Sequence, residues 1–284
     1  MESLFIEPFR ADFMQTGLLA AAVVGVLCGV VGCFVLIRGM ALMSDAVAHG
    51  VVPGIAVAFL LTAGTAGEDP SRAAILLGAL AGGALTAAGT SVILRRTSLR
   101  PDTATAVVFV FMLALGVVVI SGSDDYTVDL TSFLFGDVLA VPSSEVPISA
   151  GITALVLAAV AVLYRPLVLL CFDRRRAVAA GLPVERLELA LLALLTLAVV
   201  IGFRIVGALL VLGMLMAPPA AASLLTRRLP AMMAVSSGIA VVSAPLGLLL
   251  SWHLDTAAGA SIVLVAVGFF VLALILRPSR TIRA

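Results

Sequence analysis

The sequence has 284 residues, of which 62% are hydrophobic and only 12% are charged. Apolar runs of about 18 residues or more recur along its length, which excludes a soluble domain and predicts an all-α, polytopic integral membrane protein. With 17 basic and 16 acidic residues the net charge is +1, so no nucleic-acid partner is implied. The acidic stretch 1–12 is not expected to act as a cleaved signal peptide.

Nine segments are long enough to span a bilayer, although the sixth is short and leaves the expected number at eight or nine. The segments cover residues 13–37, 40–64, 73–95, 102–122, 146–164, 187–203, 205–225, 230–252 and 257–276. We expect the pair Pro218-Pro219 to distort the seventh. Residues 128–141 are too few to span and predict a short helix at, or re-entering, one membrane face. Residues 1–284 are interpreted as a single transmembrane domain.

The arginines orient these segments. If the segments alternate in direction, 14 arginines fall on one side of the membrane: Arg38, Arg95, Arg96, Arg100, Arg165, Arg174, Arg175, Arg176, Arg186, Arg227, Arg228, Arg277, Arg280 and Arg283. Only Arg10, Arg72 and Arg204 fall on the other side. Because cytoplasmic loops carry the excess of basic residues, this predicts an external N-terminus and a cytoplasmic C-terminus.

The basic residues are all arginines, since the sequence contains no lysine. A P-loop nucleotide site needs its lysine on the phosphates, and Schiff-base or serine–lysine chemistry also needs one. Any ATP that drives this protein must therefore be hydrolysed by a separate ATPase chain. Cys28, Cys33 and Cys171 are odd in number and lack Cys-x-x-Cys spacing, so we expect buried small residues rather than ligands or a disulfide.

Asp45 and His49 interrupt the second apolar segment. Four residues apart, they share one face of a helix. Counting from Arg38 at about 1.5 Å per residue, Asp45 lies about 10 Å and His49 about 16 Å into the membrane. Ionisable groups at such depth usually mark a pathway, and carboxylate plus imidazole suits divalent transition metals. The alternative interpretation is a buried, hydrogen-bonded couple that fixes helix packing.

The residues after His49 are expected to interrupt the helix. Gly50, Pro53 and Gly54 follow directly, and proline removes a backbone donor, so a broken or kinked helix is predicted. Transporters expose backbone carbonyls to substrate at such breaks. Ser44 and freed carbonyls near Pro53 are thus further candidate oxygen ligands.

The longest predicted cytoplasmic segment spans residues 165–188. Within it, residues 172–184 favour a short helix in which Asp173 caps the start and Gly181 the end, while Pro183 prevents continuation. This helix is either an ordinary interfacial loop helix or a docking site for a cytoplasmic partner. In the second case Arg174, Arg175 and Arg176 are candidate contacts.

Several motifs together resemble the permease of bacterial zinc/manganese/iron ABC importers. Residues 32–54 are similar to a family signature with Gly-x-Phe-x-x-x-Arg, Asp-Ala-x-x-His and Leu-Pro-Gly, except that Val52 replaces the usual leucine and Ala48 a frequent serine. The other matching stretches are residues 129–139, 179–183, 206–211, 218–222 and 224–228. Residues 179–183 resemble the segment that couples the permease to its ATPase.

The resemblance implies a type II ABC importer permease that works as a homodimer in the bacterial cytoplasmic membrane. It implies two ATPase subunits, an extracytoplasmic metal-binding receptor, and manganese, zinc or possibly iron as cargo rather than as a permanent cofactor. It assigns the metal site to Asp45 and His49, and coupling to Asp173, Arg174, Arg175, Arg176 and Gly181.

Two other classes of protein compete with this interpretation. A proton-coupled secondary metal transporter would also place carboxylates and histidines in the membrane, although such carriers often show inverted repeats and no second Asp-x-x-x-His occurs. An intramembrane enzyme is disfavoured, because neither His-Glu-x-x-His nor Gly-x-Ser-x-Gly is present.

Overall fold

The computed structural model describes residues 11–66, 72–121 and 141–276, which are folded into α-helices joined by short connections. The helices are α2 (Asp12–Arg38), α3 (Ala41–Ala66), α4 (Arg72–Arg96), α5 (Pro101–Ser121), α7 (Glu145–Phe172), α8 (Arg174–Ala179), α9 (Val184–Val206), α10 (Ala208–Leu225), α11 (Leu229–Leu254) and α12 (Ala258–Leu276). Within the described residues, nine of these helices are long and apolar enough to cross a bilayer. The predicted all-α, multi-pass architecture is thereby confirmed.

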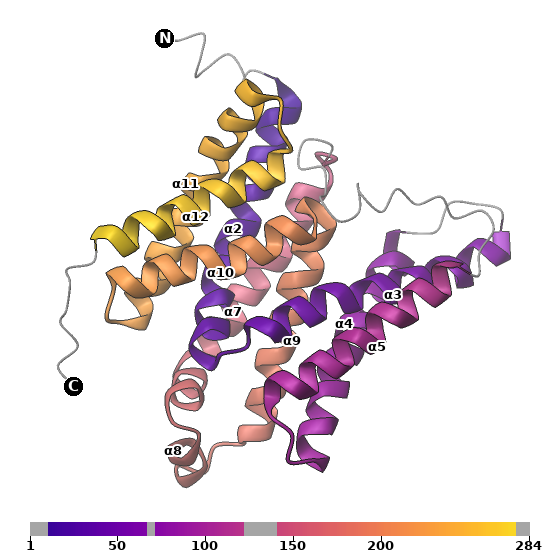
Figure 1. Ribbon diagram of the computed structural model, residues 1–284, viewed down its shortest axis with the longest axis vertical. Coiled ribbons are helices and arrows are strands. Elements are labelled where there is room, and N and C mark those ends of the chain that lie inside the picture. Colours follow the sequence, from indigo (N-terminus) through magenta and orange to yellow (C-terminus); the bar gives the residue numbers. More distant parts are fainter. Residues whose placement is uncertain (1–10, 67–71, 122–140, 277–284) are drawn as a thin grey trace.

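The helices form two groups that stand side by side (Figure 1). In one group α3 packs closely against α4 and α5; the other is built from α2, α7 and α9 to α12. Helix α9 joins the groups, because it contacts α2 and α7 as well as α3 and α4. The short helix α8 lies at one end of the molecule, beside the ends of α7 and α9.

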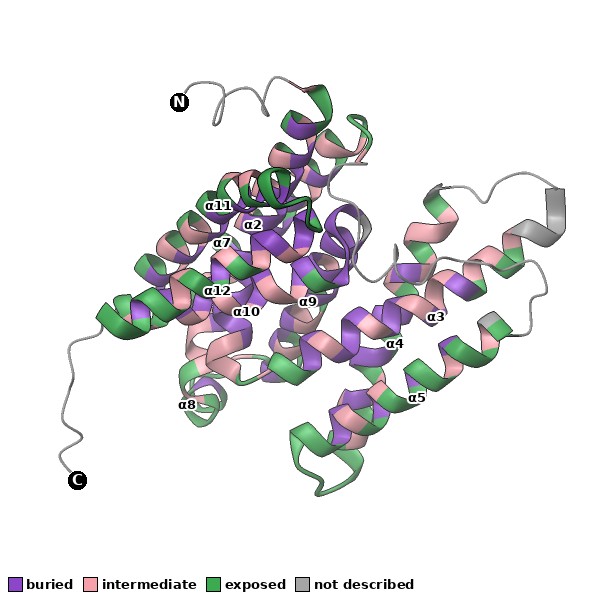
Figure 2. Cartoon of the chain, turned by 45° about the horizontal axis from the view of Figure 1, so that its top comes forward, coloured by how far each residue is buried: buried purple, intermediate pink, exposed green. Residues whose placement is uncertain are grey.

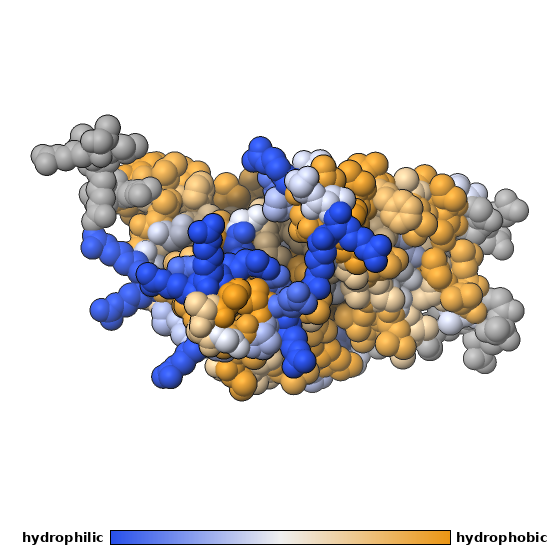
Figure 3. All heavy atoms as spheres, turned by 90° about the horizontal axis from the view of Figure 1, so that it is seen from below, coloured by the Kyte–Doolittle hydropathy of each residue, from blue (hydrophilic) through white to orange (hydrophobic). Residues whose placement is uncertain are grey.

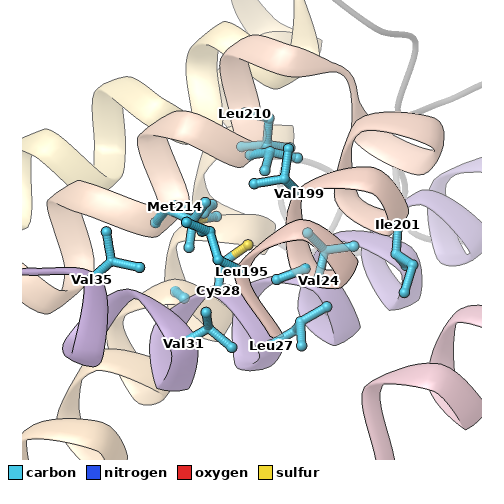
Figure 4. Packing of buried hydrophobic residues seen from close by; sticks show 14 of the residues in the cluster. Val24, Leu27, Cys28, Val31, Val35, Leu195, Val199, Ile201, Leu210 and Met214 are labelled. Atoms are coloured by element: carbon cyan, nitrogen blue, oxygen red, sulfur yellow. The ribbon is translucent and has the colours of Figure 1, made fainter. Parts of the chain in front are cut away.

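Helices α2 and α9 are the most buried spanning helices, whereas α5 is largely exposed along its length (Figure 2). The core lies where α2, α9 and α10 meet, as Figure 4 shows. Its members include Leu27 and Cys28 of α2, Leu195 of α9 and Met214 of α10, each at most 1% exposed. Lipid tails are as apolar as these side chains, so their close van der Waals packing, more than the hydrophobic effect, holds the bundle together.

Several segment boundaries differ from the sequence prediction. Helix α7 continues to Phe172, well beyond residue 164, and α10 begins only after Gly207, whose φ of 82° is left-handed. Pro218 and Pro219 do not end α10, which runs on to Leu225. Cys28 and Cys33 are buried as predicted and Cys171 is partly buried; all three are free thiols. Residues 128–140 of the predicted re-entrant helix, and with them the whole 129–139 motif, lie outside the described residues.

Candidate metal site and docking segment

Asp45 and His49 lie on α3, which is continuous from Ala41 to Ala66. Of the break or kink predicted after His49, the break is wrong, because Pro53 is inside the helix and does not end it. Because Pro53 has no N–H, the carbonyl oxygen of His49 still lacks its normal helical donor four residues ahead. His49 thus offers a ring nitrogen and a backbone oxygen from the same stretch of helix.

The turn before α3 changes the expected depth of the pair. Arg38 ends α2 rather than starting α3, and Gly39 reverses the chain in a left-handed conformation with φ 66°. The N–H of Met40 donates to the Val35 carbonyl at 2.9 Å, which closes this turn. Measured along α3 from Ala41, His49 lies only about 12 Å into the helix at 1.5 Å per residue, nearer the Arg38 end than predicted.

The two side chains face one another without forming a tight couple. The Nε2 atom of His49 lies 3.6 Å from Oδ1 of Asp45, which is longer than a hydrogen bond. The side chain of His49 is 24% exposed and that of Asp45 is 38% exposed. A buried, hydrogen-bonded packing couple would be closed off and bonded, so the geometry favours a site that is open to a ligand.

Helix α5 supports the imidazole from one side. The ring of Phe109 meets the ring of His49 edge to face, with centroids 5.2 Å apart and planes at 81°. Such an arrangement restricts the tilt of the imidazole. Gly116 of the same helix lies against Pro53, where an added Cβ would be 3.4 Å from the proline Cδ. Helix α5 therefore covers α3 both at the pair and at the proline that follows it.

Glycines fix α3 against α4 on an adjacent face of the helix. Gly50 and Gly54 of α3 face Gly78 and Gly82 of α4, and Cβ atoms added at these positions would overlap the neighbouring backbone or, at Gly50, Thr86. The spacing Gly-x-x-x-Gly occurs once in each helix, which lets the two backbones approach closely. Both motifs are present in the sequence, and neither was part of the prediction. The close approach holds the backbone of α3 in place directly after His49.

The pair by itself is an incomplete metal site. Among the described residues, no group of three or more His, Cys, Asp and Glu side chains lies close enough to hold a metal ion. Ser44, a predicted extra ligand, is fully buried and its hydroxyl donates to the Ala41 carbonyl at 2.7 Å. Any further ligands must come from backbone oxygens, water or another chain.

The predicted docking helix is present as α8, and its ends are built as predicted. The carboxylate of Asp173 accepts a hydrogen bond from the Arg176 N–H at 3.0 Å. Gly181 is left-handed with φ 73°, and the Leu182 N–H donates to the Ala177 carbonyl at 3.1 Å. A left-handed glycine with these bonds is a standard helix C-cap. Of the six residues in α8, only Ala177 is buried.

Charged side chains surround α8. Seen from the α8 end, hydrophilic side chains gather over α8 and the neighbouring helix ends, while apolar side chains cover the flanks (Figure 3). The guanidinium of Arg176 lies 3.1 Å from the Asp173 carboxylate, and Arg95 of α4 lies 3.1 Å from Glu185 of α9. Glu188 of α9 binds two arginines, Arg38 and Arg174. Glu188 was not among the functional residues predicted from the sequence.

The nine long apolar helices of the described part of the chain, with one charged end (Figure 3), are typical of a polytopic membrane protein. Residues 10–277 match the model of a family described as the ABC 3 transport family. The chain belongs to this family. The resemblance to ABC importer permeases seen in the sequence is thereby confirmed.

Two relatives and one solved structure are similar over nearly the whole chain. The manganese transport system membrane protein MntC of Halalkalibacterium halodurans is 39% identical, covering 95% of this chain and 89% of its own. The chelated iron transport system membrane protein YfeD of Yersinia pestis is 35% identical, with 99% and 91% covered. The structure of PsaBC from Streptococcus pneumoniae in complex with Fab matches with a TM-score of 0.84 at 35% identity, covering 98% and 97%.

Proposed function

We propose that this chain is the permease subunit of an ABC importer that carries a divalent transition metal, manganese foremost, across the bacterial cytoplasmic membrane. The observation that carries the proposal is the Asp45–His49 pair, open to a ligand, within a chain of the ABC 3 transport family. Relatives named for manganese and iron transport support these two metals, and zinc remains compatible with the ligands. Family membership favours this role over a proton-coupled carrier.

The pair suits a transient binding step. The Asp45 carboxylate supplies negative charge that offsets part of the cost of dehydrating a divalent ion. His49 adds a neutral ring nitrogen, and its carbonyl, left without a helical donor by Pro53, adds an oxygen. One chain by itself offers three ligands, fewer than the six that manganese prefers. A transported ion must bind weakly enough to leave again.

A second copy of the chain would complete the site. Two-fold symmetry presents the same patch from both subunits, so a pathway on the axis receives two copies of each ligand. The partly exposed side chains of Asp45 and His49 are consistent with such an arrangement. Two carboxylates and two imidazoles, together with carbonyls or water, give a complete shell for a divalent ion. The proposal therefore includes a homodimer in which the metal is cargo and not a resident cofactor.

ATP hydrolysis and delivery of the metal ion are carried out by other proteins. A chain without lysine cannot form a P-loop, so ATP is hydrolysed by a separate ATPase that docks at α8 through Asp173, Arg174, Arg175, Arg176 and Gly181. The arginine-rich end faces the cytoplasm, which leaves the N-terminus outside and the C-terminus inside. A metal-binding receptor delivers the ion from the outer side to the single transmembrane domain.

The test uses the permease with its ATPase and receptor in liposomes. Asp45→Asn keeps the size of the side chain and removes its charge, and His49→Ala removes the nitrogen. Both should abolish Mn²⁺ uptake and weaken Mn²⁺ binding to the purified permease, with dimerisation and ATPase binding unchanged. His253→Ala and Asp102→Asn, exposed groups of the same chemistry, serve as controls. Uptake at the wild-type rate in both Asp45→Asn and His49→Ala would make the pair structural.

A further inference from the structure

One carboxylate connects the docking helix with the helix that precedes the metal pair. The Oε1 atom of Glu188, on α9, lies 2.8 Å from Nη2 of Arg38 and 3.0 Å from Nε of Arg174. Arg38 also donates from Nη1 to the Leu170 carbonyl at the end of α7, at 3.4 Å. The ends of α2, α7, α8 and α9 are therefore linked through the side chains of Glu188 and Arg38.

Each of the two arginines lies at a helix end, where its displacement would move the neighbouring segment. Arg174 is the first residue of α8, so it moves with the docking segment. Arg38 is the last residue of α2 and is followed by the left-handed Gly39. Helix α3 starts at Ala41, two residues after Gly39, and carries Asp45 in its second turn. A displacement of Arg38 therefore acts on the turn that sets the start of α3.

Ion pairs add to the packing that joins these elements. Helix α8 packs mainly on α7 and α9, and Glu188 links it to α2 through Arg174 and Arg38. A cavity of about 460 Å³ lies beside the three charged groups and also borders Leu42 and Met43 in the first turn of α3. This open space allows α8 and α3 to shift relative to one another while the ion pairs hold.

We propose that Glu188 is a positioning residue that transmits movement of α8, through Arg38, to the metal pair on α3. This inference rests on the proposed importer function and deepens it. ATP-driven displacement of α8 shifts Arg174, Glu188 follows, and Arg38 carries the change into the Gly39 turn. The metal site and the ATPase site then change state together, because an equilibrium coupling requires both sites to bias one connected element.

The role of Glu188 in coupling can be tested separately from its contribution to folding stability. Arg174 is 58% exposed, and the Glu188 side chain is 27% exposed. The Arg38–Glu188 pair is less exposed, at 22% and 27%, but the amide oxygen of Glu188→Gln still accepts a hydrogen bond from Arg38, so this variant should insert and assemble. A neutral amide of the same shape still fills the space but no longer holds two guanidinium groups. The effect should appear in the coupling of transport to hydrolysis.

The chain offers a matched control one turn away. Glu185 lies on the same helix, is 74% exposed and pairs only with Arg95, so far as the described residues show. Glu185→Gln therefore makes the same chemical change without touching Arg38 or Arg174. The measurement is the number of Mn²⁺ ions taken up per ATP hydrolysed, in liposomes containing permease and ATPase with the receptor outside.

We expect Glu188→Gln to lower this ratio about fivefold or more, with basal hydrolysis and Mn²⁺ binding to the permease as in wild type. Arg38→Gln should lower it similarly, and the double variant should lose no more than either single one, because both changes cut the same connection. Glu185→Gln should keep the wild-type ratio.

Four results would overturn the proposal: a wild-type ratio in Glu188→Gln, an equal loss in Glu185→Gln, additive losses in the double variant, or failure of Glu188→Gln to assemble. Failure of the importer function itself looks different. In that case the wild-type complex neither binds nor takes up Mn²⁺, whatever stands at position 188.

Discussion

A Cβ atom on Gly54 of α3 would lie 2.9 Å from the Cα atom of Gly82 in α4. Side chains do not approach a backbone so closely, so these two helices touch backbone to backbone at this point. The contact comes one turn after His49 and directly after Pro53. It therefore determines where α3 lies just beyond the candidate metal ligands.

Adding one methyl group at this crossing should displace α3. Gly82→Ala places a Cβ against the backbone of Gly50, and overpacking of this kind costs about 1–3 kcal/mol. We expect a lower thermal midpoint of the purified permease and reduced Mn²⁺ uptake. Gly151→Ala adds the same methyl group on α7, where no atom lies within 4 Å, and should leave uptake unchanged and the midpoint no lower, since alanine favours a helix over glycine. Equal stability of the two variants would show that the crossing tolerates separation.

Much of the fold was predictable because the membrane imposes simple rules. Nine apolar segments and their order follow from length and hydropathy, since backbone groups in lipid must bond within their own helix. The ends of α8 followed from Asp173 and Gly181, whose capping chemistry is local. Local chemistry of this kind requires no knowledge of neighbouring helices.

The errors arose where a neighbouring helix decides the outcome. Pro53 was expected to break or kink α3, but the helix continues past it, packed backbone to backbone against α4 and in van der Waals contact with Gly116 of α5. The edge contact of Phe109 with His49 and the position of Glu188 join segments distant in sequence. A single sequence gives hydropathy and local capping, and it does not say which helix faces which.

The C-cap of α8 allows a test of whether the left-handed backbone at Gly181 matters for ATPase binding. Gly181 has φ 73° and no atom within 4 Å of an added Cβ, so a side chain there meets strain and no clash. Gly181→Val should cost about 1 kcal/mol locally and loosen the end of α8. We expect weaker ATPase binding and slower uptake in an otherwise folded chain.

Gly181→Asn is the matched control, because asparagine tolerates the left-handed conformation better than valine. It should retain most of the uptake. If valine and asparagine behaved alike, φ at this position would be irrelevant to docking. If both variants took up Mn²⁺ at the wild-type rate, the segment would be only a connector.

Charge at the exposed face of α8 should govern the association with the ATPase. Arg175 is exposed and lies in the middle of the arginine run, so Arg175→Glu should weaken binding of the ATPase about tenfold, less so at high salt. Arg100→Glu reverses an exposed arginine in the α4–α5 turn and should have a smaller effect. Binding constants from titration at two salt concentrations decide between local docking and a general effect of net charge.

The purified chain should hydrolyse no ATP by itself. The reason is the absence of lysine, which removes the phosphate-binding side chain of a P-loop. With the cognate ATPase, hydrolysis should appear, and the metal-loaded receptor should stimulate it. Steady-state phosphate release from permease, ATPase and their complex measures this directly. Hydrolysis by the permease alone, retained through repeated purification, would contradict the assignment of the power source to a separate chain.

The ring of Phe109 should tune the metal site through the orientation of His49. The rings meet edge to face at 5.2 Å, an interaction of about 0.5–1.5 kcal/mol, so Phe109→Ala should weaken Mn²⁺ binding by about two- to tenfold. The matched control is Phe111→Ala on the same helix, because Phe111 is 57% exposed and faces away from the α3 contact. Mn²⁺ binding to the purified permease, followed by the half-saturating concentration for uptake, separates ligand orientation from loss of fold. Wild-type affinity in Phe109→Ala would mean that α3 alone orients the imidazole, whereas an equal loss in Phe111→Ala would point to general loosening of α5.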